Sequence, residues 1–232
     1  MTRIGAFADL HANLPALDAL LAEFDRQGCD QVISVGNAVG DSPASGPVFD
    51  RMVDAGVTML LGDSEVSILV GAAAPEYLSK AQTNTVRRLC FMQSVFSGDQ
   101  RVSFQYFGLR GGRSEFLSPS SEIPVGEHLD AMFYRLPGTV VVHGSAPAPS
   151  DVLTSSRRYI NPGAAGCSPE ARYAVVDILT DRVEATVGSA SYETTGLRTP
   201  VLLTRPARIP RRQPAVPAFR PVVETRDLSL VE

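Results

Sequence analysis

The sequence lacks the long apolar run that a membrane-spanning helix requires. No stretch of its 232 residues reaches the roughly 18 consecutive apolar residues of such a helix. The first residues show no charged-then-apolar signal region with a small-residue cleavage site. We therefore expect a soluble, cytoplasmic protein. The hydrophobic fraction of 44% fits a globular chain with one sizeable core and argues against wholesale disorder.

Cysteine is scarce, and its spacing supports neither a zinc knuckle nor a disulfide scaffold. Cys29, Cys90 and Cys167 are scattered and odd in number, and no Cys-x-x-Cys pair occurs. We expect three free thiols that are buried or half-buried.

Acidic residues are absent from one segment of an otherwise acidic chain. The formal net charge is −4, yet residues 198–223 carry six arginines and no acid. An acidic body disfavours nucleic acid as the main partner. Regularly spaced prolines exclude helix and central strand near the C-terminus. We predict a domain at residues 1–195 and a Pro/Arg-rich extension at 196–232. The extension is expected to pack on its own fold or to join a second copy in a homo-oligomer.

The first part of the chain alternates short apolar strands with amphipathic helices. This order predicts a parallel sheet with covering helices. The expected elements are a strand at 4–8, a helix capped by Asn13 and ended by Gly28, a strand at 31–35, a short helix at 48–53 and a strand at 57–61.

The second part is richer in strands. We expect two sheets packed together with helices outside. The expected elements are a helix at 76–95, a strand at 101–107, a Gly-rich loop at 109–113, a helix at 127–135, strands at 139–143 and 158–160, and a hairpin of 172–178 with 182–187.

Polar side chains follow each of the first three predicted strands. Asp9 and His11 follow the first, Asn37 the second and Asp63 the third. In a parallel sheet these positions share the carboxyl edge, where ligands bind. Carboxylate and imidazole suit Mn, Fe or Zn, and two such ions activate water and clamp a phosphate. The pattern predicts a metal site at this edge.

Four segments resemble the calcineurin-like metallophosphoesterases, and most closely the YfcE-type bacterial phosphodiesterases. Residues 4–17 are similar to the family's opening motif, 35–43 to its second and 60–65 to its third. Residues 161–166, followed by 173–177, resemble its closing turn and last hairpin. The resemblance implies a four-layer α/β/β/α sandwich of two mixed sheets.

The family's functional residues carry over only in part. Asp9 and His11 match metal ligands, whereas Asn37 stands where the family has a bridging aspartate. Asp63 replaces a ligand asparagine, and Ser64 replaces the histidine that protonates the leaving group. A neutral amide does not hold two cations together as a carboxylate does. A general acid is typically worth about 10²–10⁴-fold in rate.

Two further segments lose family histidines. Phe107 is expected at one ligand position, and Ser145 and Pro147 at two others. These losses affect one centre together. We therefore expect a metallophosphoesterase-fold protein that is catalytically impaired or inactive and has a binding or regulatory role. The alternative is an active phosphatase or phosphodiesterase with a reduced, mononuclear site, in which Asp9, His11, Asn37 and Asp63 hold one divalent metal (Mn, Fe or Zn).

Simpler structural roles remain open for the same side chains. Asp9 and His11 can hydrogen-bond loop backbone, and Asn37 and Asp63 can be turn residues. The strand-end position of all four favours a site, with or without a metal.

The remaining polar candidates lie outside the strand ends named so far. Asp41 is a candidate compensating ligand on a long loop. His143 could replace a lost ligand but is expected to point elsewhere, and His128 is expected on a helix surface. Arg110 and Arg113 flank a Gly-Gly turn and are the candidate anion-binding residues for a phosphorylated small molecule.

Overall fold

The computed structural model describes residues 1–40, 42–71, 76–106, 108–110, 113–115, 126–133, 136–144 and 146–193. The predicted Pro/Arg-rich extension at 196–232 lies outside these residues, so it stays a prediction. Asp41, Phe107 and Ser145 also lie outside them.

The first sheet contains five strands in the order β12-β11-β1-β2-β3. β1 pairs parallel with β2, β2 pairs parallel with β3, and the pairs β1–β11 and β11–β12 are antiparallel. The sheet is therefore mixed. Its strands are β1 (Thr2–Phe7), β2 (Gln31–Ser34), β3 (Thr58–Met59), β11 (Glu170–Ile178) and β12 (Val183–Ser191).

The second sheet contains five strands in the order β4-β5-β8-β10-β9. The central pairs β5–β8 and β8–β10 are parallel, and both edge pairs are antiparallel. Its strands are β4 (Met92–Ser97), β5 (Gln100–Gln105), β8 (Val140–His143), β9 (Ser150–Leu153) and β10 (Arg158–Asn161). A separate hairpin joins β6 (Gly108–Arg110) and β7 (Arg113–Glu115).

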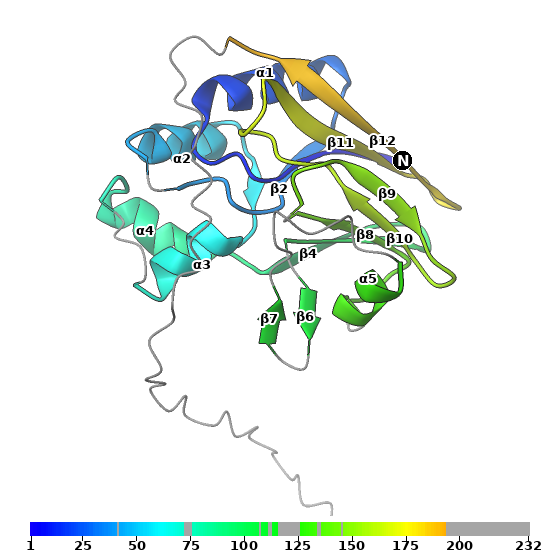
Figure 1. Cartoon of the computed structure of the whole chain (residues 1–232). Helices are drawn as coiled ribbons and strands as arrows, with labels where there is room; N and C mark the ends of the chain where they lie inside the picture. Colours follow the sequence, from blue (N-terminus) through cyan, green and yellow to red (C-terminus); the bar gives the residue numbers. More distant parts are fainter. Residues whose placement is uncertain are drawn as a thin grey trace, which may run out of the picture. The chain divides into compact units, whose positions relative to one another are not determined.

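Alternation along the strands builds one core between the sheets and further cores outside them. In β1, Ile4 and Ala6 face the inter-sheet core, whereas Phe7 packs on the helix side. In β8, Val142 faces the inter-sheet core and Val141 faces the opposite layer. The two mixed sheets with helices outside confirm the predicted α/β/β/α sandwich (Figure 1).

Helices cover the outer face of each sheet (Figure 1). On the first sheet, Leu17 and Phe24 of α1 pack with Met52 of α2 over the strands. On the second, Leu129 and Met132 of α5 pack over Val141 and Tyr159. The helices are α1 (Leu14–Arg26), α2 (Ser45–Asp54), α3 (Asp63–Leu69), α4 (Lys80–Val86) and α5 (Gly126–Met132).

The predicted long helix at 76–95 is wrong. The chain forms only α4 there, and Ser79 and Gln82 cap its first turn reciprocally. β4 then begins at Met92 and pairs with β5 through a turn in which Gly98 has φ +56°. Strand pairing in the second sheet therefore overrides the helical spacing of the apolar residues. The sequence interpretation also missed α3, β9 and the β6–β7 hairpin.

The cysteines and the absence of a long apolar helix were two further expectations. All three cysteines are free, but Cys90 is exposed, so the expectation of buried or half-buried thiols is wrong at that position. Among the described residues, the model contains no helix with the length and apolar character needed to cross a bilayer.

Candidate functional site

Two loops at the carboxyl ends of β1 and β2 adopt a rare backbone conformation. Asp9, His11 and Asn37 have φ values of 54°, 48° and 54°, a region that non-glycine residues seldom occupy. Backbone hydrogen bonds hold the loops together, from Asp9 N to Gly36 O (3.0 Å) and from His11 N to Asn37 O (3.0 Å). Such conformations persist only where surrounding contacts fix them, and they gather at functional sites.

The turn that follows β10 supports the Asp9 loop from its other side. The Gly166 N–H donates to Asp9 O (2.9 Å), and the Asn13 side chain donates to Gly166 O (3.0 Å). Asn161 fixes the turn itself, because its side-chain oxygen accepts the Gly163 N–H (3.1 Å), and its amide NH₂ anchors the turn by donating to Ala146 O and Ala148 O. The closing motif thus positions the first motif.

The Asp9 carboxylate, the Asn37 amide and the Tyr106 hydroxyl form a closed ring of hydrogen bonds. Tyr106 OH donates to Asp9 Oδ1 (2.6 Å). Asn37 Nδ2 donates both to Asp9 Oδ1 (2.9 Å) and to Tyr106 OH (2.6 Å). All three residues are buried, with exposed fractions of 6%, 4% and 3%. We call these three residues the Asp9 cluster.

The orientation of the Asn37 amide follows from its partners. Asn37 Oδ1 accepts the backbone N–H of Ser64 at 2.8 Å, so Nδ2 must face Asp9. A flipped amide would set an oxygen against the Asp9 carboxylate and an NH₂ against an N–H donor. Burial, followed by the charge of Asp9, raises the pKa of Tyr106 well above its ordinary value. The hydroxyl therefore keeps its proton and donates a hydrogen bond to Asp9.

Glu65 clamps the loops that carry these residues. It is 2% exposed, and its carboxylate accepts the backbone N–H groups of Asn37, Ala38, Val39 and Gly62 at 2.9–3.2 Å. Burial raises the pKa of Glu65, and these N–H donors oppose the rise. One side chain thus satisfies donors from two loops and fixes the start of α3.

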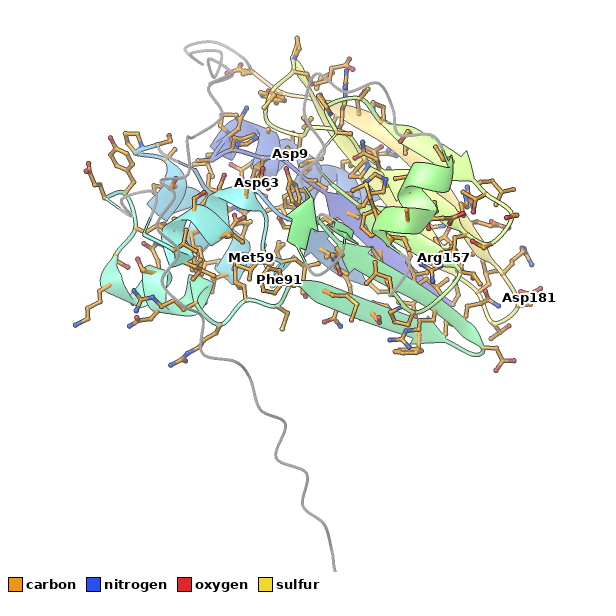
Figure 2. The ribbon with its side chains drawn as sticks, turned by 60° about the horizontal axis from the view of Figure 1, so that its bottom comes forward. Asp9, Met59, Asp63, Phe91, Arg157 and Asp181 are labelled. Atoms are coloured by element: carbon orange, nitrogen blue, oxygen red, sulfur yellow. The ribbon has the colours of Figure 1, made fainter. Side chains whose placement is uncertain are left out.

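Asp63 and His11 lie near the Asp9 cluster but are less well satisfied. His11 Nε2 is 3.7 Å from Asp9 Oδ1, and its side chain is 34% exposed. Asp63 Oδ1 is buried without a hydrogen-bond partner. Burial raises the pKa of Asp63 to about 7, and the charges of Asp9 and Glu65 add to the effect. Figure 2 shows Asp9 and Asp63 close together, far from Asp181 in the β11–β12 turn.

Other predicted candidates lie elsewhere. His143 faces the α5 layer, where its ring packs on Phe133 with centroids 5.4 Å apart. Its side chain therefore points away from the Asp9 edge, as expected, and burial lowers its pKa to about 4. Pro147 contributes only its carbonyl, which accepts from Ala164 N (3.0 Å). Arg110 and Arg113 are register partners at the end of the β6–β7 hairpin, and their side chains lie outside the described part of the structure.

The donor set does not fit a two-metal centre. Asp9 Oδ1 already accepts an N–H and an O–H. A metal ion at this place would need ligands that offer lone pairs, whereas these two donors present hydrogens to it. Among the described residues, no group of three or more His, Cys, Asp or Glu side chains could hold a metal ion. Asp9, His11, Asn37 and Asp63 do share one edge, as predicted. The amide of Asn37, however, turns its NH₂ group toward Asp9 and its oxygen toward Ser64 N–H.

Two site residues were missed by the sequence interpretation. Tyr106 continues the inward alternation of Val102 and Phe104 in β5, and the sequence interpretation gave it no role. Glu65 lay inside the third motif but was given no role. An acid three residues after Gly62, at the start of a helix, was the available signal for a capping carboxylate.

Comparison with known proteins identifies the fold. No protein-family model matches the chain, and no curated protein matches its sequence. Solved structures do match, and they show that the chain has the metallophosphoesterase fold.

Three of these structures are a metallophosphoesterase, a phosphodiesterase and a hypothetical protein. The metallophosphoesterase of Sphaerobacter thermophilus is 21% identical, with a TM-score of 0.60, over 83% of this chain and 89% of its own. A hypothetical protein of Pyrococcus horikoshii OT3 is 17% identical, with a TM-score of 0.66, over 84% and 90%. An archaeal phosphodiesterase is 15% identical, with a TM-score of 0.52, over 81% and 99%. At these identities the comparison establishes the fold alone.

Proposed function

We propose that this chain is a metallophosphoesterase-fold protein that has lost most or all phosphoesterase activity and serves as a binding or regulatory protein. The observation that carries the proposal is the orientation of the Asn37 amide. Its oxygen is bound to Ser64 N–H and its nitrogen to Asp9 Oδ1. A residue in this orientation cannot bridge two cations, so the clamp on the phosphate is missing.

The position of Ser64 supports the same conclusion. A general acid needs a pKa near the operating pH, as histidine has. A serine hydroxyl does not titrate in that range. Ser64 contributes its backbone N–H to Asn37, which is a structural task. Loss of the general acid and loss of the bridging ligand would therefore act on the same reaction step.

We further propose that a phosphorylated small molecule, as a bound ligand, would take its cationic contacts from Arg110 and Arg113. The described edge itself offers the carboxylates of Asp9, Asp63 and Glu65, which repel a phosphate. The two arginines are register partners on one hairpin, and arginine binds phosphate oxygens through charge-assisted hydrogen bonds.

A turnover assay tests the main proposal. The purified full chain is incubated with bis(p-nitrophenyl) phosphate and with Mn²⁺, Fe²⁺ or Zn²⁺ in turn. We expect no metal-dependent hydrolysis above that of the Asp9→Ala variant. Robust metal-dependent turnover that Asp9→Ala abolishes would overturn the proposal.

Asp63 favours a second candidate function, a weak hydrolase with one metal ion. Asp63 Oδ1 is buried without a hydrogen-bond partner, and a half-exposed His11 lies near Asp9. Asp9, His11 and Asp63 are not placed as a ready ligand group among the described residues, so this candidate requires them to close around a single ion, which would supply Lewis acidity. This candidate predicts about one metal per chain by elemental analysis after Mn²⁺ loading. No metal at any ion tested would remove it.

A further inference from the structure

The Asp9 cluster joins the two sheets of the sandwich. Asp9 and Asn37 follow β1 and β2 of the first sheet, and Tyr106 follows β5 of the second. The ring of hydrogen bonds therefore crosses the inter-sheet core at its polar end. In a metal-containing site of this kind, ions would attract carboxylates from several loops. Here the Tyr106 hydroxyl and the Asn37 amide hold the Asp9 carboxylate instead.

Two glycines, Gly36 and Gly144, leave space for the Tyr106 ring because they have no Cβ. A Cβ on Gly36 would lie 2.9 Å from Tyr106 Cδ2, and a Cβ on Gly144 would overlap the same ring. The Gly144 N–H also donates to Tyr106 O (3.1 Å). The tyrosine thus occupies a slot that fits it on both sides, and its hydroxyl reaches Asp9 from a fixed position.

We infer that the Tyr106 hydroxyl and the Asn37 amide are a built-in replacement for a cation at this edge. They hold the buried Asp9 carboxylate and tie the two sheets together without an ion. The inference rests on the proposed function and deepens it, because it explains how the edge keeps its structure after the metal ligands are lost. Buried carboxylates need a charge or several donors. Asp9 Oδ1 accepts from Tyr106 OH and from Asn37 Nδ2, and a third hydrogen bond, from Asn37 Nδ2 to Tyr106 OH, closes the ring.

The first test compares matched Tyr→Phe variants by thermal unfolding. Tyr106→Phe removes one donor from a buried carboxylate, and we expect the melting temperature to fall by about 5 °C. Tyr159→Phe is the control, because Tyr159 is also buried but its hydroxyl donates to a partly exposed carboxylate, that of Asp130 (2.7 Å). We expect a fall of about 2 °C there. Equal falls would contradict the special role of Tyr106.

The second test uses Mn²⁺ alone as the probe and needs no variant to fold. The wild-type melting temperature should agree within about 1 °C between EDTA and excess Mn²⁺, because an ion with no site adds no stability. A rise of several degrees with Mn²⁺ that is absent in Asp9→Ala would overturn the inference.

A double variant restores the conditions for metal binding. Asn37→Asp with Tyr106→Phe exchanges two donors for a second carboxylate, beside Asp9 and His11. We expect excess Mn²⁺ to raise the melting temperature of this variant by about 5 °C. No response to Mn²⁺ in the double variant would count against the replacement role. Turnover by the wild type would refute the proposed function, whereas metal-dependent stability without turnover would refute only this inference.

Discussion

Glu65 and Asp63 are two acids on the same turn of α3, and their surroundings are opposite. Glu65 accepts four backbone N–H groups, whereas Asp63 Oδ1 is buried without a hydrogen-bond partner. Burial raises the pKa of both, but only Glu65 has donors that offset the cost. Glu65 therefore stabilises the loops at this edge of the sheet, whereas the buried oxygen of Asp63 lacks a hydrogen-bond donor.

The difference follows from where the helix begins. Glu65 is the third residue of α3, and its carboxylate reaches back to Gly62 N–H and across to the loop after β2. Asp63 is the first residue, and it faces Asp9. A carboxylate at that place would suit a cation, which makes Asp63 the natural position for testing residual metal binding.

The largest expected effect is the loss of the Glu65 clamp. Glu65→Ala leaves four backbone N–H groups without their acceptor, and we expect the free energy of unfolding to fall by about 4 kcal/mol. Urea denaturation measures this loss. Glu184→Ala is the control, because Glu184 is an exposed acid that pairs with Arg182, and we expect a change below about 0.5 kcal/mol. Similar losses in both variants would refute the clamp.

The next effect comes from Gly62, which directly precedes α3 and lies against Asn37. A Cβ at Gly62 would overlap Asn37 N and lie 2.7 Å from Asn37 Oδ1. We therefore expect Gly62→Ala to cost about 3 kcal/mol by urea denaturation. Gly40→Ala is the matched control, since a Cβ there meets nothing within 4 Å. A Gly62→Ala protein as stable as Gly40→Ala would contradict the described packing.

Local patterns explain why much of the fold could be predicted. The Asn13 cap, where Ala16 N donates to the Asn13 side chain (3.1 Å), and the short apolar run of β1 depend on neighbours in sequence. The helix expected at 76–95 failed because pairing between β4 and β5 is set by the second sheet. Periodicity does not contain that information.

The site was predictable only where its residues follow strand ends. Asp9, Asn37 and Asp63 do, and they share one edge in the structure. Tyr106 comes from the other sheet, so its contact with Asp9 depends on how the sheets pack. The direction of the Asn37 amide depends on Ser64 N–H. Neither follows from residue type or spacing.

A smaller effect is expected from the unsatisfied acid. Asp63→Asn removes a buried charge near Asp9 and Glu65, and we expect it to raise the free energy of unfolding at pH 8 by about 1.5 kcal/mol. Urea denaturation at that pH, in the presence of EDTA, measures the gain. Asp181→Asn is the control, because Asp181 is an exposed acid in the β11–β12 turn, and little change is expected there. Destabilisation by Asp63→Asn would mean that the charged carboxylate has a partner in solution.

The smallest effect is the pH dependence that Asp63 contributes. Its folded pKa of about 7 lies above the ordinary unfolded value of about 3.9, so the folded protein binds this proton more tightly. The resulting stability is fully present below about pH 4 and is lost as the pH rises through about 7. Between pH 6 and pH 7 the wild type should therefore lose about 1 kcal/mol relative to Asp63→Asn. Urea denaturation of both proteins at the two pH values measures it. Parallel pH profiles would show that Asp63 is as well solvated as an ordinary surface acid.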